Sequence, residues 1–147
     1  MTADKCVFCR IIRGELPAHR VYEDERVLAF LDILPSTAGH TLIIPKSHVA
    51  QVEGLSEEDS SALFRALYLL VGRIQEAVGA TASTIGINNG PGSGQEIPHV
   101  HIHVIPRSKG DGGGIVQGIV RSTSRHNEDD MIRTAGRIKE LVRAEVK

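Results

Sequence analysis

The stretch that decides the fold and the chemistry is His99-Val100-His101-Ile102-His103-Val104-Ile105. Histidine alternates here with branched apolar residues, which is the pattern of a β-strand that has one polar and one apolar face. The sequence therefore predicts a strand in which His99, His101 and His103 share one face and the apolar residues pack on a helix. A single strand histidine is usually an ordinary core or surface residue, whereas three in alternation indicate a site.

The spacing of the three histidines argues against one metal ion bound by all of them. At about 3.3 Å per residue, the Cα atoms of His99 and His103 lie about 13 Å apart, whereas zinc–nitrogen bonds are only about 2.1 Å long. Neutral imidazole is also a competent nucleophile near neutral pH, because its unperturbed pKa is near 6.5. We therefore expect a division of labour, with an outer histidine available to a metal and the others to chemistry.

Around this strand, hydrophobic periodicity and turn residues predict an α+β domain with a mostly antiparallel sheet. A long amphipathic helix is expected to begin after Ser56 as its N-cap and to end near Gly79. A short helical turn is expected at 7–13, and a last helix from about Asn127 to Val146. The expected strands cover 19–23, 26–33, 40–44, 83–88 and 100–105.

Length and composition limit the organisation of the chain. Its 147 residues, 41% of them hydrophobic, suffice for one compact domain with a core and are too few for two comfortable ones. We expect a single domain over 1–147, with a C-terminal helical extension over about 115–147.

Charge and cysteine usage exclude several classes of partner. Lys and Arg total 17 against 18 for Asp and Glu, so no overall field would hold a nucleic acid or an anionic membrane. Apolar runs fall short of the roughly 20 residues that span a bilayer, and the N-terminus does not resemble a signal peptide. The two cysteines, Cys6 and Cys9, are too close in sequence to cross-link distant parts of a secreted fold. A reducing, cytoplasmic setting fits best.

A glycine-rich loop precedes the histidine strand. The segment 88–95 (NNGPGSGQ) combines residues that allow close backbone approach with polar side chains, so its N–H groups could cradle a phosphate. The same composition also makes an ordinary loop between strands. Its position directly before the three histidines favours the phosphate-binding interpretation.

The histidine strand and its surroundings resemble the histidine-triad nucleotide hydrolases and transferases, the HIT family. The resemblance rests on the triad, on Pro106-Arg107 after it, and on the segments 6–35, 39–48 and 88–95. It implies a HIT-like fold and a homodimer. It also implies that His101 attacks the α-phosphorus of a nucleotide and carries the nucleotidyl group, while His103 contacts the phosphate or the bridging atom.

The resemblance also implies which residues bind the nucleotide. Loop positions Asn88, Gly94 and Gln95 match those that contact phosphate or ribose in the family. Asp32 matches the carboxylate that accepts hydrogen bonds from the ribose 2′- and 3′-hydroxyls. The apolar base pocket would be formed by Ile11, Phe30 and Ile33, and His40 would support the catalytic histidines.

One position departs from the family's pattern. Ser or Thr usually follows the Gly-Gln pair, and here the residue is Glu96. An anion there would repel a phosphate that a hydroxyl could bind. Glu96 is therefore not included in the site, and the preferred leaving group is left open.

Cys6-x-x-Cys9 has the spacing of half a tetrahedral zinc site. A redox pair lacks the βαβ context here, and two free thiols are the simplest alternative. Bacterial relatives complete such a site with the histidine after Pro-Lys-x and the first triad histidine, which are His48 and His99. The resemblance thus implies a structural zinc bound by all four side chains.

The function that these observations favour is hydrolysis at the α-phosphate of purine nucleotides, as in a nucleoside 5′-monophosphoramidase, through a nucleotidyl-histidine. A dinucleoside polyphosphate hydrolase or phosphorylase of the same family is the alternative enzyme. A zinc-stabilised nucleotide-binding or interaction module with little catalysis, and a zinc hydrolase with an open coordination position, are the alternatives from other classes.

Overall fold

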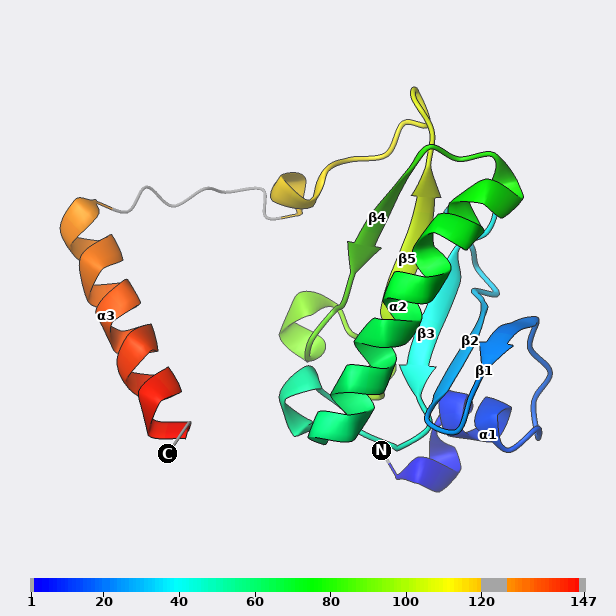
Figure 1. Ribbon diagram of the computed structural model, residues 1–147, viewed down its shortest axis with the longest axis horizontal. Coiled ribbons are helices and arrows are strands. Elements are labelled where there is room, and N and C mark those ends of the chain that lie inside the picture. Colours follow the sequence, from blue (N-terminus) through cyan, green and yellow to red (C-terminus); the bar gives the residue numbers. More distant parts are fainter. Residues whose placement is uncertain (1, 120–126, 146–147) are drawn as a thin grey trace. The chain divides into compact units, whose positions relative to one another are not determined.

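The computed structural model describes residues 2–119 and 127–145, and its internal contacts divide the chain into two units, Met1–Gly113 and Gly114–Lys147. The first unit contains a five-stranded sheet with the order β1-β2-β3-β5-β4, in which every neighbouring pair is antiparallel (Figure 1). This architecture confirms the predicted α+β fold. Its helices and strands are α1 (Val7–Ile12), β1 (Arg20–Glu23), β2 (Val27–Leu31), β3 (Thr41–Pro45), α2 (Glu57–Val78), β4 (Ala82–Gly86) and β5 (Ile102–Arg107).

The two faces of the sheet bury two separate apolar clusters, because neighbouring strand residues point to opposite sides. On one face, alternate residues of β2, β3 and β5 pack on α2, which confirms that Ile102 and Val104 face the long helix. On the other face, Leu28, Phe30 and Leu42 pack on α1. The short N-terminal helix is therefore held on the sheet face opposite α2.

Helix α2 begins and ends where its capping residues predict. The Ser56 side chain accepts a hydrogen bond from the Asp59 backbone N–H at 3.1 Å, and Glu57, Glu58 and Asp59 place negative charge in the first turn. Gly79 adopts the left-handed conformation at φ 67° and closes the helix. Helix α2 spans 22 residues and covers one face of the sheet (Figure 1).

The β1–β2 hairpin forms as predicted, but β2 ends at Leu31 rather than at residue 33. Asp24 closes the turn because its carboxylate accepts hydrogen bonds from the Arg26 and Val27 N–H groups. At the other end, the Asp32 carboxylate accepts the Leu34 N–H at 2.9 Å, which turns the chain out of the sheet. Asp32 therefore lies just after the strand.

The strand predicted at 100–105 begins at Ile102, so His99 and His101 lie outside it. The ladder between β3 and β5 ends at the pair Ile43–Ile102. Upstream of it, the Val100 N–H donates to the Val49 carbonyl at 2.7 Å, so this backbone bonds to the loop after β3 instead of to the strand itself. The prediction that all three histidines stand on one strand was wrong for the first two.

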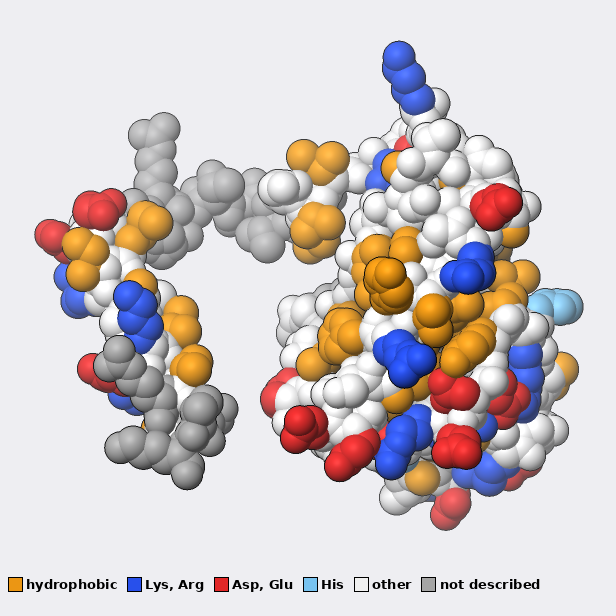
Figure 2. All heavy atoms as spheres, in the orientation of Figure 1, with side chains coloured by type: hydrophobic (Ala, Val, Ile, Leu, Met, Phe, Trp, Pro, Cys, Tyr) orange, Lys and Arg blue, Asp and Glu red, His pale blue; other side chains and the backbone are white. Residues whose placement is uncertain are grey.

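The surface of the first unit carries exposed apolar side chains (Figure 2). On α2 these are Phe64, Tyr68 and Val78, which are 45%, 80% and 38% exposed, and Ile85 of the edge strand β4 is 41% exposed. Large apolar side chains exposed on neighbouring elements often mark an interaction surface. We call these four residues the α2/β4 apolar surface.

The second unit contains α3 (Glu128–Glu145), which agrees with the helix predicted from about residue 127; Val146 lies outside the described residues. The helix is amphipathic, and apolar residues recur at helical spacing. None of the helices formed by residues 2–119 and 127–145 is long and apolar enough to cross a membrane. The exposed apolar side chains of α3 are Met131, Ile132, Ile138, Leu141 and Val142.

Candidate functional site

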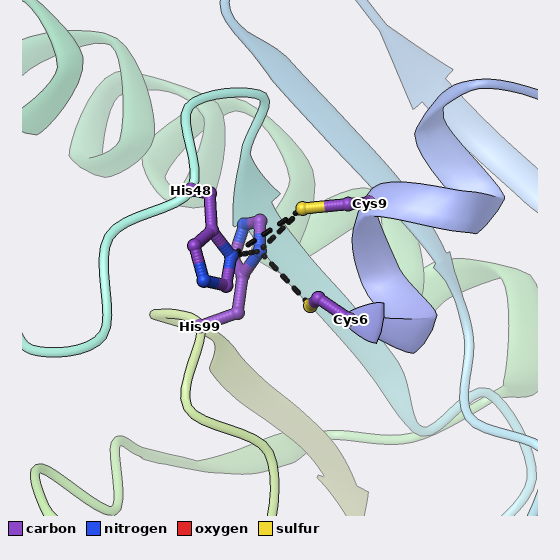
Figure 3. A group of neighbouring side chains, drawn as sticks. All are labelled: Cys6, Cys9, His48 and His99. Atoms are coloured by element: carbon purple, nitrogen blue, oxygen red, sulfur yellow. Dashed lines mark hydrogen bonds between the residues drawn. The ribbon is translucent and has the colours of Figure 1, made fainter. Parts of the chain in front are cut away.

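Three segments that are far apart in sequence bring four metal-ligating side chains together. Cys6 and Cys9 come from the start of α1, His48 from the loop after β3, and His99 from the segment before β5 (Figure 3). Their sulfur and nitrogen atoms all lie within 4.8 Å of one another. Cys6, Cys9 and His99 are buried, and His48 is half-buried. We call these four residues the metal cluster.

The spacing of these atoms fits a tetrahedral zinc ion. With Zn–S bonds of about 2.3 Å and Zn–N bonds of about 2.1 Å, tetrahedral geometry separates sulfur from nitrogen by about 3.6 Å and nitrogen from nitrogen by about 3.4 Å. The His99 Nδ1 lies 3.6 Å from each of the two sulfurs, and the two histidine Nδ1 atoms lie 3.4 Å apart. Two thiolates and two imidazoles are a donor set that Zn²⁺ takes in closed structural sites.

His99 is held in the tautomer that a metal ligand requires. Its Nε2–H donates to the Pro45 carbonyl at 2.8 Å, so its Nδ1 lone pair faces the two sulfurs. Burial lowers the pKa of His99 to about 4, which keeps the ring neutral. Burial, together with the neighbouring Cys6, raises the pKa of the Cys9 thiol to about 11. A bound cation would favour the thiolate that this environment otherwise disfavours.

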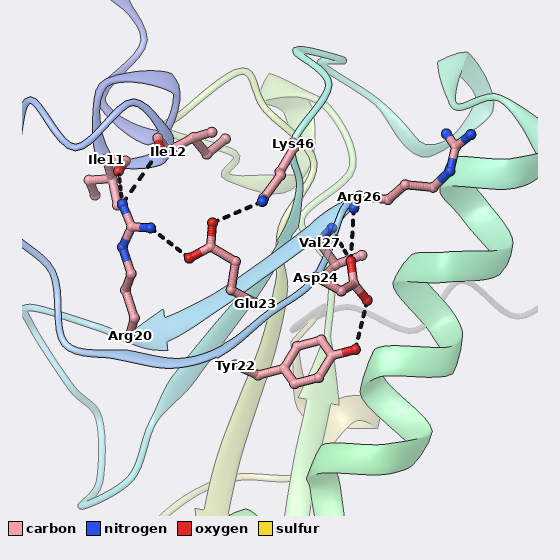
Figure 4. A network of polar contacts seen from close by, with 9 residues as sticks. All are labelled: Ile11, Ile12, Arg20, Tyr22, Glu23, Asp24, Arg26, Val27 and Lys46. Atoms are coloured by element: carbon pink, nitrogen blue, oxygen red, sulfur yellow. Dashed lines mark hydrogen bonds and ion pairs between the residues drawn. The ribbon is translucent and has the colours of Figure 1, made fainter.

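A polar network ties α1 to the chain that leads to His48. The Arg20 guanidinium donates to the Ile11 carbonyl at 2.6 Å, at the C-terminal end of α1 (Figure 4). Glu23 then bridges Arg20 at 2.7 Å and Lys46 at 2.8 Å. Since Lys46 lies two residues before His48, this network links two of the three segments of the metal cluster.

His101 lies next to the metal cluster in sequence but presents its ring differently. Its Nδ1 lies 2.7 Å from the His99 carbonyl, and because a carbonyl only accepts, Nδ1 must carry the proton. The Nε2 atom therefore carries the lone pair, as a nucleophile requires. The ring is buried, and its centroid lies 4.9 Å from that of His103.

A chain of hydrogen bonds also fixes the tautomer of His103. The Ser36 N–H donates to His40 Nδ1 at 3.1 Å, so the proton of a neutral His40 is on Nε2. That Nε2–H donates to His103 Nδ1 at 2.9 Å, which leaves the His103 proton on its own Nε2. Burial lowers the pKa of His40 and lowers that of His103 to about 4, so both rings stay neutral at pH 7.

Asp32, His40 and His103 also lie close enough to be considered as metal ligands. The orientation of the central ring argues against one ion bound by all three. His40 Nδ1 faces the Asp32 carboxylate at 3.6 Å, whereas its Nε2 faces His103, and the two nitrogens point away from each other. The hydrogen bonds here instead form a relay that runs from the Ser36 N–H through His40 to His103.

The match to known proteins agrees with this arrangement. The HIT domain family matches residues 13–110, which hold two of the four metal-cluster residues, His48 and His99, and both histidines of the relay. The chain belongs to the HIT family. "Protein hit" of Bacillus subtilis is 46% identical over 119 residues, covering 78% of this chain and 79% of that one. The adenosine 5′-monophosphoramidase hnt1 of Schizosaccharomyces pombe is 38% identical over 102 residues, covering 69% and 74%.

Solved structures of HIT proteins share the fold. A HIT family member from Bacillus subtilis has a TM-score of 0.82 at 37% identity, covering 92% of this chain and 96% of that one. A Zn-bound histidine triad family protein from Mycobacterium smegmatis has a TM-score of 0.70 at 32% identity, covering 97% and 99%. A zinc-bound relative and the donor geometry here together make the metal cluster a site that could bind zinc.

The glycine-rich loop of this HIT domain is held in shape by Gln95, one of the residues predicted to bind the nucleotide. The Gln95 side chain accepts the Gly90 N–H at 2.8 Å and donates to the Ala50 carbonyl at 2.7 Å. Gly90 has φ 93° and is buried, and a Cβ there would lie 2.7 Å from the Gln51 side chain. Gln95 therefore shapes the loop, while Asn88, Gly94 and Glu96 are exposed.

The three residues expected in the base pocket differ in burial. Ile11 and Phe30 are 8% and 3% exposed and belong to the apolar cluster beneath α1, whereas Ile33 is 91% exposed. Sequence reasoning also missed Phe8 in that cluster, whose ring contacts those of His99 and His101. Its place between Cys6 and Cys9 was the signal available in the sequence.

Proposed function

We propose that this HIT protein hydrolyses purine nucleotides at the α-phosphate, as a nucleoside 5′-monophosphoramidase does, through a nucleotidyl intermediate on His101. The observation that carries the proposal is the pair of opposite tautomers. His101 presents an Nε2 lone pair, and the neighbouring His103 presents an Nε2–H. A nucleophile beside a hydrogen-bond donor is the arrangement that transfer at phosphorus requires.

In the first step, His101 Nε2 forms a bond to the α-phosphorus. The bond from phosphorus to the leaving nitrogen breaks, its electron pair goes to that nitrogen, and the nitrogen takes a proton from solvent. The His103 Nε2–H donates a hydrogen bond to a phosphate oxygen or to the leaving group, which stabilises the charge that develops. Because His101 keeps its proton on Nδ1, the bond to the His99 carbonyl persists through the step.

In the second step, a water oxygen bonds to phosphorus and the bond from phosphorus to His101 Nε2 breaks. The electron pair returns to the ring, the proton of the water goes to solvent, and a nucleoside monophosphate is released. The same His103 Nε2–H supports this step. Two successive displacements thus replace one difficult one.

The predicted nucleotide contacts would complete the site around this pair. The Asp32 carboxylate lies next to His40 and has acceptor capacity beyond its bond to the Leu34 N–H, which suits ribose hydroxyls. Exposed Asn88 and Gly94 and the loop brace Gln95 would line the phosphate. The names of two relatives, hnt1 and the adenylylsulfatase HINT3 of Arabidopsis thaliana, favour an adenosine nucleotide; HINT3 is 42% identical over 106 residues, 72% of this chain and 54% of that one.

In the metal cluster, zinc would be structural. Cys6, Cys9, His48 and His99 would hold it and leave no coordination position for water, so it would fix α1, the loop after β3 and the segment before β5 in place. Two buried free thiols are also typical of a reducing compartment, which favours the cytoplasm.

We further propose that the protein is a homodimer that binds neither nucleic acid nor membranes. The α2/β4 apolar surface supports self-association, and one edge of β4 is open because the described strand pairs only with β5. The near-balance of charges supports the absence of an anionic polymer as partner.

Rates on two substrate classes test the proposed activity. We expect an adenosine phosphoramidate to be hydrolysed with a kcat/KM at least about tenfold above that of diadenosine polyphosphates, and the adenosine product to be AMP. A preference for the diadenosine polyphosphates would favour the alternative enzyme, and turnover of neither would favour a binding module. Substitution of the nucleophile, His101→Gly, shows whether the turnover belongs to this site.

A further inference from the structure

Phe8 lies between Cys6 and Cys9 in the sequence. Its ring contacts that of His99, which belongs to the metal cluster, and that of His101, the proposed nucleophile. Its ring centroid lies 5.8 Å from that of His99 and 5.3 Å from that of His101, at interplanar angles of 79° and 73°. A third edge-to-face contact joins it to Phe30 at 5.6 Å. The side chain is only 4% exposed, so these contacts are made in the protein interior.

The position of Phe8 depends on how α1 is held. The helix has six residues, which is too short to be stable by itself in water. Its C-terminal end is fixed by Arg20 through the Ile11 carbonyl. At its N-terminal end, Cys6 makes no side-chain capping bond, and both thiols point into the metal cluster (Figure 3). A metal bound there would therefore fix the turn of α1 that carries Phe8.

The orientation of His101 depends in turn on what its ring contacts. One hydrogen bond, from Nδ1–H to the His99 carbonyl, leaves the ring free to tilt about that bond. The rings of Phe8 and His103 limit this tilt by direct packing. Since a displacement of about 1 Å at a reacting group can cost on the order of 100-fold in rate, this packing matters to a nucleophile.

We propose that Phe8 is a positioning residue that couples occupancy of the metal cluster to the orientation of the His101 ring. Metal binding at Cys6 and Cys9 fixes α1, and Phe8 passes that constraint to the nucleophile. This inference rests on the proposed role of His101. A second route exists through the His99 backbone carbonyl, and substitution of Phe8 leaves that route intact.

Nuclear magnetic resonance of histidine side chains tests the coupling without any substrate. In protein labelled with ¹³C and ¹⁵N at histidine, the His101 ring signal is assigned by its loss in His101→Gln. We expect Zn²⁺ alone to shift and sharpen this signal in the wild type. In Phe8→Leu, we expect Zn²⁺ to shift the His48 and His99 signals as before, while the His101 signal shifts clearly less than in the wild type and keeps only the part carried by the His99 carbonyl. Phe8→Met serves as a second variant of similar volume if Phe8→Leu folds poorly.

Kinetics and a matched control separate positioning from general destabilisation. Phe8→Leu is expected to bind Zn²⁺ within about threefold of the wild type and to lower kcat on the order of tenfold with little change in KM. Leu70→Ala removes a comparably buried side chain from α2, on the opposite face of the sheet. That control should lose stability and keep both kcat and the response of the His101 signal to zinc.

Three results would overturn the proposal. The His101 signal could respond to Zn²⁺ as strongly in Phe8→Leu as in the wild type. Zinc affinity could fall in parallel with kcat, which would make Phe8 part of the metal cluster. KM could rise while kcat stays unchanged, which would place Phe8 against the substrate. Failure of the proposed function can be told apart from failure of this inference, because the response of the His101 signal to zinc can be measured even if another residue is the nucleophile.

Discussion

The metal cluster and the pair formed by His101 and His103 share a segment of five residues but use imidazole in opposite ways. The Nδ1 lone pair of His99 faces ligand atoms from α1 and from the loop after β3, and its Nε2–H donates to the Pro45 carbonyl. In His101, the Nδ1–H donates to the His99 carbonyl, and the lone pair is on Nε2. In each ring, the hydrogen bond that one nitrogen donates to a carbonyl sets which nitrogen keeps the lone pair. What this lone pair faces then separates the metal ligand from the proposed nucleophile.

The sharpest way to separate the two regions is to remove the nucleophile alone. His101→Gly should lower kcat/KM by on the order of 10⁴-fold or more, because the nucleotidyl intermediate can no longer form. Zinc content should not change, since His101 contributes no ligand atom to the metal cluster. Steady-state rates and metal analysis of the same samples check this. His19→Gln is the control at an exposed histidine, and activity of His101→Gly near the wild-type level would refute the mechanism.

The reverse experiment removes a metal ligand and leaves the nucleophile. Cys9→Ser should weaken zinc binding by more than about 100-fold and lower the melting temperature, because binding energy at a closed site is also folding energy. Competition with a chromophoric chelator gives the affinity, and calorimetry gives the melting temperature. Unchanged zinc affinity would exclude Cys9 as a ligand.

A smaller effect is expected from the relay that sets the tautomer of His103. His40→Phe keeps a buried ring but removes the donor to His103 Nδ1, and should lower kcat by about 10- to 100-fold. His40→Gln offers an amide N–H at a similar place and should recover part of that loss. Equal activities of the two variants would show that His40 acts only by its volume.

Acid should destabilise the zinc-free protein through its buried histidines. The folded-state pKa of His103 is lowered to about 4. Below pH 6.5, His103 therefore binds a proton in the unfolded chain but stays unprotonated in the folded one until the pH nears 4. The free energy of unfolding should therefore be constant above about pH 7 and fall as the pH drops from 6.5 towards 4. Urea denaturation in the presence of a chelator, at pH 7.5, 6 and 5, measures this. His103→Gln should flatten the dependence, and an equally steep loss in that variant would exclude His103 as its source.

The elements of the fold could be read from local sequence because their signals are local. Ser56 and Gly79 bound α2 where their capping chemistry predicts, and Asp24 makes the expected hairpin turn. The start of β5 could not be predicted in this way, because it depends on contacts with residues far away in the sequence. His99 turns to the Pro45 carbonyl and Val100 bonds to Val49, and neither contact is visible in the alternation of residues 99–105.

The candidate site was predictable in part for the same reason. The resemblance to the HIT family brought Cys6, Cys9, His48 and His99 into one hypothesis, and the structure places their ligand atoms together. Ile33, which is expected in a base pocket, is 91% exposed because the chain leaves the sheet after Leu31, and its role stays a prediction. Periodicity says nothing about side chains in such turns. A single domain over 1–147 remains a prediction.

The most direct test of the division of labour is mass spectrometry of protein mixed with a slowly hydrolysed adenosine phosphoramidate and quenched in acid-free denaturant. We predict a single adenylyl adduct that peptide mapping places on His101, formed in zinc-loaded protein and absent from His101→Gly. An adduct on His99 or His103, or turnover to AMP with no trapped adduct under conditions in which the second step is limiting, would contradict the account.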